Sequence, residues 1–334
     1  MKLRSSRLSL LLVGMALALS ACASDAPQDF TKPEGPIAKQ VDRLFDPVFA
    51  VAVVVFVLVE GLVLYVAMRF RERPGHDDAP TQTHGNTRLE ITWTIIPALL
   101  LAVIGVFTVV TILDINKVDA TGEALEVDVY GHQWWWEYRY PGEGVITANE
   151  LHIPTGRRVE LKLQSKDVIH SFWPPKLAGK VDVVPGHVNH MAIEATEPGT
   201  YYGQCAEFCG LSHSRMRLRV VAHSPAEFAT WLAGQKQQPA KPSTSDEGAA
   251  LFQSKGCAGC HTVAGFTAGE IGPNLTHLYS RKTFAGAIFD LNEQNLRTWL
   301  RDPQGRKPGS LMKLPVKLNE EEITKLIAYL ETLK

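Results

Sequence analysis

Two long apolar runs constrain the fold of this chain more than any other feature. Residues 48–68 are almost wholly apolar, and residues 95–113 form a second run of the same kind. Since about 20 apolar residues suffice for a helix to cross a bilayer, each run predicts a membrane-spanning helix. Four arginines lie between the runs, namely Arg69, Arg71, Arg73 and Arg88. Short loops rich in arginine stay in the cytoplasm, so residues 48–113 are expected to form a hairpin whose two outer ends lie outside.

The N-terminus has the layout of an export signal. Residues 1–21 begin with basic side chains, continue through an apolar run over residues 8–19 and end in small residues. The ending Leu19-Ser20-Ala21-Cys22 resembles a bacterial lipoprotein signal, which implies that Cys22 becomes the lipid-modified first residue. A plain signal cleaved near Ala21-Cys22-Ala23 is the alternative. Both interpretations place residues 22–47 on the outer side, in agreement with the hairpin topology.

Two acidic residues lie in or beside the apolar runs. Glu60 falls inside the first run, where a carboxyl is costly, and it is either functional or packed against a partner subunit. Glu90 lies just before Trp93-Thr94-Ile95-Ile96-Pro97, at the cytoplasmic edge of the second run. By position alone, Glu90 is an ordinary acid of the membrane interface.

After residue 114 the periodicity changes from helical to alternating. Apolar and polar residues alternate over residues 125–130, 159–163 and 216–220, and Pro/Gly turns separate such segments. This pattern predicts a β-sandwich or barrel over residues 114–234. Residues 235–245 contain no apolar residue larger than alanine and predict a flexible linker.

Residues 246–334 return to a helical pattern. Ser245 can cap a helix that carries Asp246 and Glu247 in its first turn, and Asn319 with Glu322 resembles a capping box. Apolar residues follow the second cap at helical spacing, at positions 323, 326, 327 and 330. The pattern predicts a small all-α domain, which is too small to be stable without a stabilising centre.

That centre is the motif Cys257-Ala258-Gly259-Cys260-His261. Cys-x-x-Cys-His is the attachment motif of c-type haem, in which both thiols bind the porphyrin and the histidine reaches the iron. A redox dithiol is the alternative, but it does not require the histidine. Met312 is the only methionine after the motif and is the expected second axial ligand, with His277 as its rival. Because a Met/His pair raises the potential of a haem, it suits an electron carrier.

Around this motif, residues 246–334 resemble class I cytochrome c, and the resemblance includes the stretch Gly272-Pro273-Asn274-Leu275. It implies a covalently bound haem c held by Cys257 and Cys260, with His261 and Met312 on the iron.

A second group of metal-binding residue types lies in residues 205–216. Two thiols, an imidazole and a thioether recur every three or four residues, at Cys205, Cys209, His213 and Met216. One loop could wrap these groups around a soft metal such as copper. The spacing alone also fits a disulfide or a zinc site. Because the group follows Tyr201-Tyr202-Gly203, the loop is expected to join the last two strands of the sandwich.

Together with its flanking motifs, this stretch resembles the dinuclear copper (CuA) loop of cytochrome c oxidase subunit II. The resemblance covers residues 41–223 and includes Gly131-His132-Gln133-Trp134-Trp135-Trp136, Asp167-Val168-Ile169-His170-Ser171-Phe172-Trp173-Pro174 and the tryptophan–proline motif after Glu90. It implies a ligand set of two bridging thiolates, two imidazoles and two weak donors: Cys205, Cys209, His170, His213, Met216 and the backbone carbonyl of Glu207.

The resemblance assigns further roles. The Glu207 side chain is expected to face a magnesium or manganese ion at the contact with the large subunit, because a carboxylate suits such a hard cation. Trp134 matches the aromatic residue at which electrons enter the copper site, and Glu90 matches the acid at the mouth of a proton pathway. The family usually has Trp-Tyr-Trp where this chain has three tryptophans, so a shared role for Trp135 stays open. Five histidines match no ligand position: His132, His152, His187, His190 and His223.

The resemblance implies a multidomain membrane protein with a two-helix hairpin, a cupredoxin-like β-sandwich and a small all-α cytochrome c domain. Such a protein receives electrons for a proton-pumping cytochrome c oxidase of the bacterial inner membrane. Electrons would pass from a donor cytochrome c to haem c, to CuA and to subunit I, where oxygen is reduced; subunit III is a further implied partner. The chain shows no oxygen-reducing site of its own. Its 34 basic and 35 acidic side chains give a net charge of −1, which does not indicate a nucleic-acid partner.

Two alternative functions stay open at the level of sequence. One is the corresponding subunit of a CuA-bearing nitric oxide reductase, against which Glu90 argues. The other is a membrane-anchored electron carrier that has no enzyme partner. The copper ligands argue against a quinol oxidase subunit, since that relative lacks them.

Overall fold

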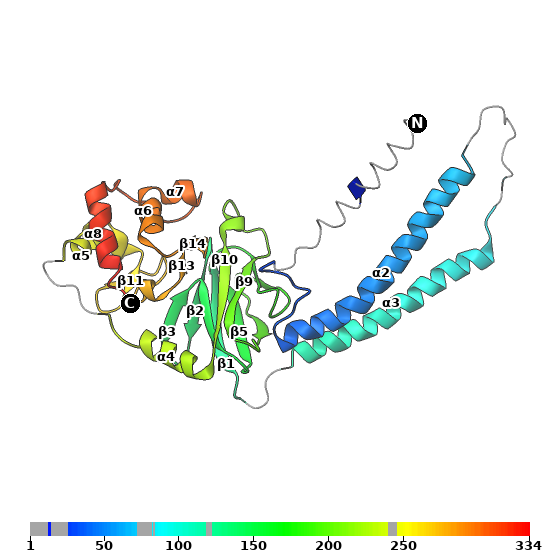
Figure 1. Ribbon diagram of the computed structural model, residues 1–334, viewed down its shortest axis with the longest axis horizontal. Coiled ribbons are helices and arrows are strands. Elements are labelled where there is room, and N and C mark those ends of the chain that lie inside the picture. Colours follow the sequence, from blue (N-terminus) through cyan, green and yellow to red (C-terminus); the bar gives the residue numbers. More distant parts are fainter. Residues whose placement is uncertain (1–12, 15–25, 72–81, 83, 118–121, 240–245) are drawn as a thin grey trace.

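The structure, a computed structural model, describes residues 13–14, 26–71, 82, 84–117, 122–239 and 246–334. A long helical hairpin lies at one end of the molecule, a β-sandwich in the middle and a largely helical domain at the other end (Figure 1). The signal predicted for residues 1–21 lies outside the described residues except for positions 13 and 14, and Cys22 lies outside them too.

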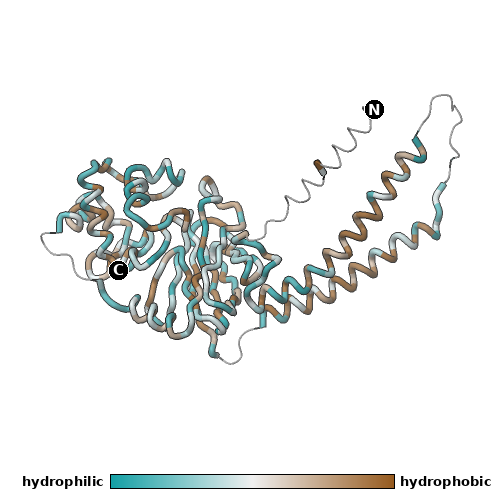
Figure 2. The backbone as a smooth tube through the Cα atoms, in the orientation of Figure 1, coloured by the Kyte–Doolittle hydropathy of each residue, from teal (hydrophilic) through white to brown (hydrophobic). Residues whose placement is uncertain are grey.

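The hairpin consists of helices α2 (Pro36–Arg69) and α3 (Thr87–Ile115), which are both long and apolar enough to cross a membrane. The most apolar window of each helix is 0% buried within this chain, as expected of helices that face lipid or a partner subunit. Figure 2 shows the apolar residues spread along both helices. The two predicted apolar runs are therefore confirmed as two helices.

Helix α2 begins at Pro36, well before the predicted start at residue 48. Its first turn packs on the sandwich, where Ile37 and Ala38 are buried and the amide of Ala38 donates to the carbonyl of Leu177 at 3.2 Å. The end of α3 is also attached, because Arg158 donates to the carbonyl of Ile115 at 3.3 Å. Both helices therefore connect directly to the domain that follows them.

The sandwich is built from two five-stranded sheets, in the orders β3-β2-β1-β5-β8 and β4-β10-β9-β6-β7. Strand pairs β1–β5 and β4–β10 are parallel, and the other pairs are antiparallel. The strands are β1 (Leu125–His132), β2 (Trp135–Tyr140), β3 (Val145–Ala148), β4 (Glu150–Pro154), β5 (Val159–Ser165), β6 (His170–Trp173), β7 (Val181–Val183), β8 (Asn189–Ile193), β9 (Gly199–Cys205) and β10 (Arg217–His223).

The burial pattern along each strand explains which strands could be predicted from the sequence. Strands β1 and β5 alternate between buried and partly exposed residues, which confirms the predicted period of two. Strand β4 is buried at all its positions and shows no alternation. Helix α4 (Pro225–Gln235) packs on the outer side of β4, where Trp231 stacks on His152 at 4.2 Å.

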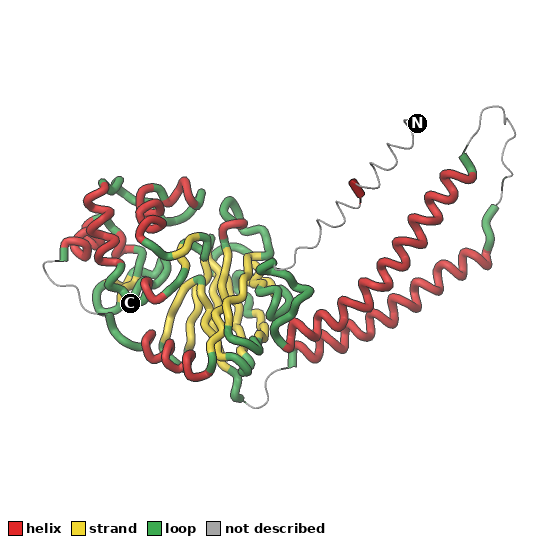
Figure 3. Tube along the Cα trace, in the orientation of Figure 1, coloured by secondary structure: helices red, strands yellow, loops and turns green. Residues whose placement is uncertain are grey.

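The C-terminal domain contains helices α5 (Glu247–Ser254), α6 (Glu293–Arg301), α7 (Pro303–Arg306) and α8 (Glu320–Leu330), which confirms its helical character (Figure 3). Two short ribbons that the sequence did not predict join them: β11 (Thr262–Val263) with β12 (Thr267–Ala268), and β13 (Thr283–Phe284) with β14 (Phe289–Asp290). Helices α5 and α8 pack closely at Gly248, which has no side chain. A Cβ at this position would lie only 2.2 Å from the carbonyl oxygen of Lys325.

The capping box predicted for Asn319 and Glu322 at the start of α8 is confirmed. At the start of α5 the N-cap is Asp246, whose carboxylate accepts from the amide of Ala249 at 2.9 Å, as this residue type suits. Ser245, the cap expected from the sequence, lies outside the described residues.

Candidate functional site

The two thiols at residues 205 and 209 lie side by side at the end of strand β9. The Sγ atoms of Cys205 and Cys209 are 3.8 Å apart, and both residues are buried. This distance is far longer than a disulfide bond of about 2.05 Å, and both cysteines are free. It is close to the spacing of about 3.8 Å expected for two sulfurs on one tetrahedral metal with bonds of about 2.3 Å.

Further donors surround these thiols. Strand β6 pairs with β9 so that Phe172 lies opposite Cys205, which places His170 over the loop that follows β9. Three nitrogen or sulfur atoms and one carbonyl come close to the two sulfurs. Nδ1 of His170 lies 3.9 Å from the Cys205 sulfur and the carbonyl of Glu207 lies 3.2 Å from it, whereas Nδ1 of His213 and Sδ of Met216 lie 3.5 and 3.9 Å from the Cys209 sulfur.

The chemistry of this donor set fits copper. Two thiolates and two imidazoles would also suit zinc, but the thioether of Met216 is a soft ligand that favours copper. The hydrogen bond between the paired thiols lowers the pKa of Cys205. This shift favours the thiolate, which is the form that binds metals.

Asp167 is a positioning residue that the sequence did not single out. Its carboxylate lies 2.7 Å from Nε2 of His170, which leaves Nδ1 directed toward Cys205. A carboxylate behind a histidine ligand fixes the orientation of the ring and raises its basicity. The position of Asp167 in the stretch that precedes His170 was the available signal.

The three consecutive tryptophans take three different positions. Trp134 donates from Nε1 to the carbonyl of Cys209 at 2.9 Å, and the side chain of Gln133 donates to the same oxygen at 2.7 Å. Trp136 is fully buried, with its ring edge toward His170. Trp135 stacks on His132 and, like Trp134, lines a pocket in the neighbouring domain. The structure therefore places two tryptophans, and not one, between the two domains.

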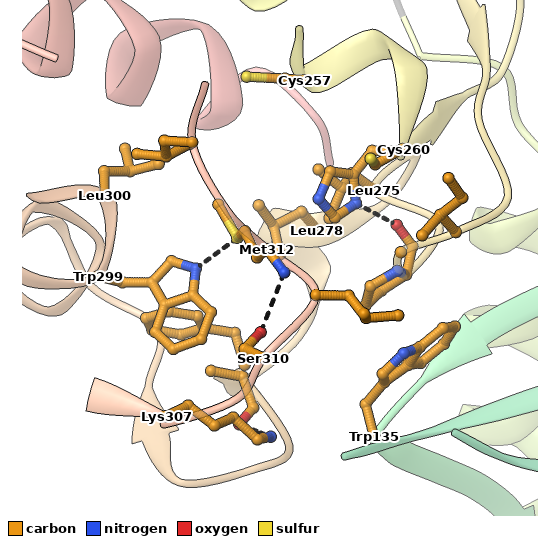
Figure 4. Close-up of a pocket in the computed structure, with 18 of the residues that line it drawn as sticks. Trp135, Cys257, Cys260, Leu275, Leu278, Trp299, Leu300, Lys307, Ser310 and Met312 are labelled. Atoms are coloured by element: carbon orange, nitrogen blue, oxygen red, sulfur yellow. Dashed lines mark hydrogen bonds between the residues drawn. The ribbon is translucent and has the colours of Figure 1, made fainter. Parts of the chain in front are cut away.

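That pocket contains the haem-attachment motif. Cys257 and Cys260 lie on one side of it and Met312 on another, and Trp135 enters from the sheet of the sandwich (Figure 4). Most of the lining is apolar, with Leu275 and Leu278 among it, as suits a porphyrin face. Both cysteines are free and hence open to thioether formation.

The donor atoms in the pocket are held by their neighbours. Nδ1 of His261 lies 2.8 Å from the carbonyl of Pro273 and can donate its proton there. Burial lowers the pKa of His261, which favours the neutral ring, so the lone pair of Nε2 is available to bind a metal. The sulfur of Met312 accepts from Nε1 of Trp299 at 3.0 Å. His277, the rival ligand, is not among the residues that line the pocket, and its Nδ1 lies 2.9 Å from the carbonyl of Lys334. These positions favour Met312.

The other predicted side chains are those of Glu207, which lies in the loop between Cys205 and Cys209, and of Glu90 and Glu60, which lie on the helical hairpin. The side chain of Glu207 is half-buried, next to Phe208, which is 76% exposed. Glu90 is exposed in the first turn of α3, at the end of the hairpin far from the sandwich (Figure 1), and accepts from the amide of Asn86 at 3.0 Å. Glu60 is exposed in the middle of α2.

Three family models match the chain in order. They are cytochrome c oxidase subunit II, transmembrane domain, over residues 23–110; cytochrome c oxidase subunit II, periplasmic domain, over residues 142–223; and cytochrome c over residues 245–334.

Curated relatives match over nearly the whole chain. Cytochrome c oxidase subunit 2 of Alkalihalophilus pseudofirmus is 37% identical over 327 residues, covering 96% of this chain and 95% of the relative. The protein of the same name from Bacillus subtilis is 36% identical over 352 residues and covers 98% of each chain. Among solved structures, the periplasmic domain of subunit II of cytochrome oxidase of Bradyrhizobium japonicum matches with 29% identity and a TM-score of 0.34, over 36% of this chain and 96% of that one.

Proposed function

The chain belongs to the cytochrome c oxidase subunit II family and ends in a cytochrome c domain, and on this premise we propose that it carries electrons from a donor cytochrome, through haem c and a dinuclear copper centre, to subunit I of a proton-pumping oxidase. Its relatives are subunits of an oxidase, which supports an enzyme-bound role over that of a free-standing carrier.

The observation that carries the proposal is the position of Trp134 between the two candidate sites. On one side, its indole donates to the backbone of Cys209, in the copper loop. On the other side, it lines the pocket that contains Cys257 and Cys260. A chain that binds both groups would therefore have them on either side of one aromatic side chain.

The residues of the two sites divide the work between them. When bound, haem c and the copper pair would supply one-electron transfer. Cys205 and Cys209 would hold the copper, and the burial of both side chains limits the access of water to their sulfurs. Asp167 holds the ring of His170 in one orientation, which limits the rearrangement that accompanies each electron. His261 and Met312 would hold the haem iron, as the Met/His pair of an electron carrier.

Several finer assignments belong to the same proposal. Phe208 and Leu211 are exposed in the same loop as Glu207, so this loop would contact subunit I, and the Glu207 carboxylate would bind magnesium or manganese there. Glu90, at the cytoplasmic end of α3, would lie at the entrance of the proton pathway into subunit I. The sandwich and the cytochrome domain would lie on the outer side of the bacterial inner membrane, with Cys22 as a lipid anchor and subunit III as a further partner.

The test is the variant Cys205→Ser in the purified complex. It should abolish cytochrome c oxidation and remove the paramagnetic resonance signal of a copper pair, while the haem stain of the same polypeptide persists. The double variant Cys257→Ala with Cys260→Ala should lose the covalent haem and keep the copper signal. If Cys205→Ser oxidised cytochrome c at the wild-type rate, the copper assignment would be wrong.

A further inference from the structure

The sandwich and the cytochrome domain meet through two buried polar side chains, one from each domain. Glu150, the first residue of β4, is 1% exposed, and Lys307, after α7, is 3% exposed. Neither residue is one of the proposed copper or haem ligands, although Lys307 also lines the pocket that contains Cys257 and Cys260. Burying a polar or charged group costs free energy unless hydrogen bonds satisfy it. The hydrogen-bond partners of Glu150 and Lys307 therefore show which contacts their burial depends on.

The partners of Glu150 lie in the cytochrome domain. Its Oε1 accepts from the amide and the hydroxyl of Thr283, both at 2.6 Å, and from the amide of Lys282 at 2.9 Å. On its own domain, Nε2 of His152 lies 3.7 Å from Oε2. Although burial acts to raise the pKa of the Glu150 carboxyl, the nearby His152 and the hydrogen bonds from Thr283 and Lys282 outweigh it and lower this pKa. The carboxylate therefore depends on the ribbon β13–β14 for its donors.

Lys307 makes the reciprocal contact. Its Nζ donates to the carbonyl of Trp134 in the sandwich and to the carbonyl of Ala285 at 2.8 Å. Burial lowers the pKa of Lys307 to about 7, and both the charged and the neutral amine can donate to a carbonyl oxygen. Gly286 lies between the domains with a positive φ, and a Cβ there would lie 2.3 Å from this amine and 2.8 Å from the Trp134 carbonyl.

Two further hydrogen bonds to backbone carbonyls of the cytochrome domain extend the contact beyond these residues. The amide of Arg217 donates to the carbonyl of Gly286 at 2.9 Å, and the hydroxyl of Ser212 donates to the carbonyl of Pro308 at 2.8 Å. A cytochrome that binds only for the moment of electron transfer typically uses a small contact with exposed charges. Here the groups at the centre are desolvated, and each would lose its partners on separation.

We propose that the cytochrome domain is permanently docked on the sandwich through Glu150 and Lys307, so that the segment 240–245 is a connection and not the element that holds the domain in place. In this position the domain covers Trp134 and Trp135, which are 6% and 8% exposed. An external donor then reaches the haem pocket and not these tryptophans. The docking rests on contacts between the domains and holds whether or not either cofactor assignment is right.

The first experiment separates docking from tethering. A specific protease site is inserted within residues 240–245, the purified complex is cut, and the amount of cytochrome fragment that stays with the complex is measured by gel filtration and mass spectrometry at low and high salt. The wild-type fragment should remain bound at both salt concentrations. Release of the cut wild-type fragment would overturn the proposal. Since the fragment is scored by mass, the result is independent of haem and copper.

Variants of the interface sharpen the test. Glu150→Gln with Lys307→Met should release at least ten times more fragment than wild type. Glu126→Gln is the matched control, because Glu126 is an exposed acid that pairs with Lys162 on the sandwich itself. Retention of the double variant at the wild-type level would refute the role of these two residues. The single variant Glu150→Gln keeps the shape of the side chain and serves if the double variant fails to fold.

A kinetic readout follows in the uncut complex. Electron transfer from haem c to the copper centre should be insensitive to ionic strength in the wild type and in Glu126→Gln. In the double variant it should become at least tenfold slower and salt-dependent. A wild-type rate that falls steeply with salt would contradict permanent docking.

Discussion

Gly131 offers a sharp test of the copper site, because it lies beside a proposed ligand without touching a metal. A Cβ added at this position of β1 would lie 2.7 Å from Cδ2 and 3.2 Å from Cγ of the His170 ring, and 3.4 Å from the ring of Trp136. Ordinary contact begins near 3.4 Å, so the variant Gly131→Ala must displace the imidazole by about 0.7 Å. The hydrogen bond to Asp167 opposes that movement.

The displacement is large on the scale of a metal site. Ligand distances in such sites hold within about 0.2 Å, so the ring cannot keep both its contact with Asp167 and its bond to copper. Disturbing the surroundings of a ligand typically lowers metal affinity by about 10- to 100-fold. Overpacking should also destabilise the sandwich by about 1–3 kcal/mol.

The assay is the copper content and paramagnetic resonance of the purified complex after dialysis against graded concentrations of a chelator. Gly131→Ala should lose copper at about 10- to 100-fold lower chelator concentration than wild type, and its covalent haem should be unaffected. Gly142→Ala is the matched control, because nothing lies within 4 Å of a Cβ at that position. A variant at 131 with the wild-type spectrum and chelator resistance would refute the reasoning.

Three further predictions concern the cytochrome domain and the sandwich. Met312→Ala should lower the midpoint potential of the haem in a redox titration, whereas His277→Gln should leave it unchanged because His277 does not line the pocket. Gly248→Ala should lower the stability of the cytochrome domain by about 1–3 kcal/mol in thermal unfolding, since its Cβ would lie 2.2 Å from the carbonyl oxygen of Lys325. Burial lowers the pKa of His152, so below about pH 6.5 the unfolded chain takes up a proton that the folded chain does not. The contribution of His152 to folding stability should therefore be complete above that pH and be lost as the pH drops through the folded pKa. The variant His152→Gln should flatten the decline in unfolding free energy between about pH 7.5 and 5.5.

The sequence revealed those parts of the fold that carry a period or a motif. Membrane helices show as long apolar runs, and half-exposed strands such as β1 show as an alternation of buried and exposed residues. The residues of Cys-x-x-Cys-His are adjacent in the sequence, so the motif is visible without the fold. Strand β4 escaped prediction because it is covered on both faces and therefore has no alternation. The start of α2 at Pro36 escaped it because the first turn of the helix is held by contacts of Ile37 and Ala38 with the sandwich and does not belong to the apolar run.

The site divides in the same way. The proposed copper ligands other than His170 lie within one loop, so spacing alone brought them together. Glu150 and Lys307 gave no signal, because their partners are 133 and 173 residues away in the chain. Trp135 is intermediate: its place in a motif was visible, but its position against the pocket depends on how two domains meet.

The anchored start of α2 has a mechanical consequence. A helix of 34 residues rises about 51 Å at about 1.5 Å per residue, whereas the hydrocarbon layer is about 30 Å thick. About 20 Å of continuous helix is therefore left over, and its first turn ends in the sandwich and not in a loose connection. The helix would therefore set the height of the sandwich above the lipid. An electron that leaves the proposed copper centre for a partner in the bilayer would then cross a distance that depends on the rise of this helix.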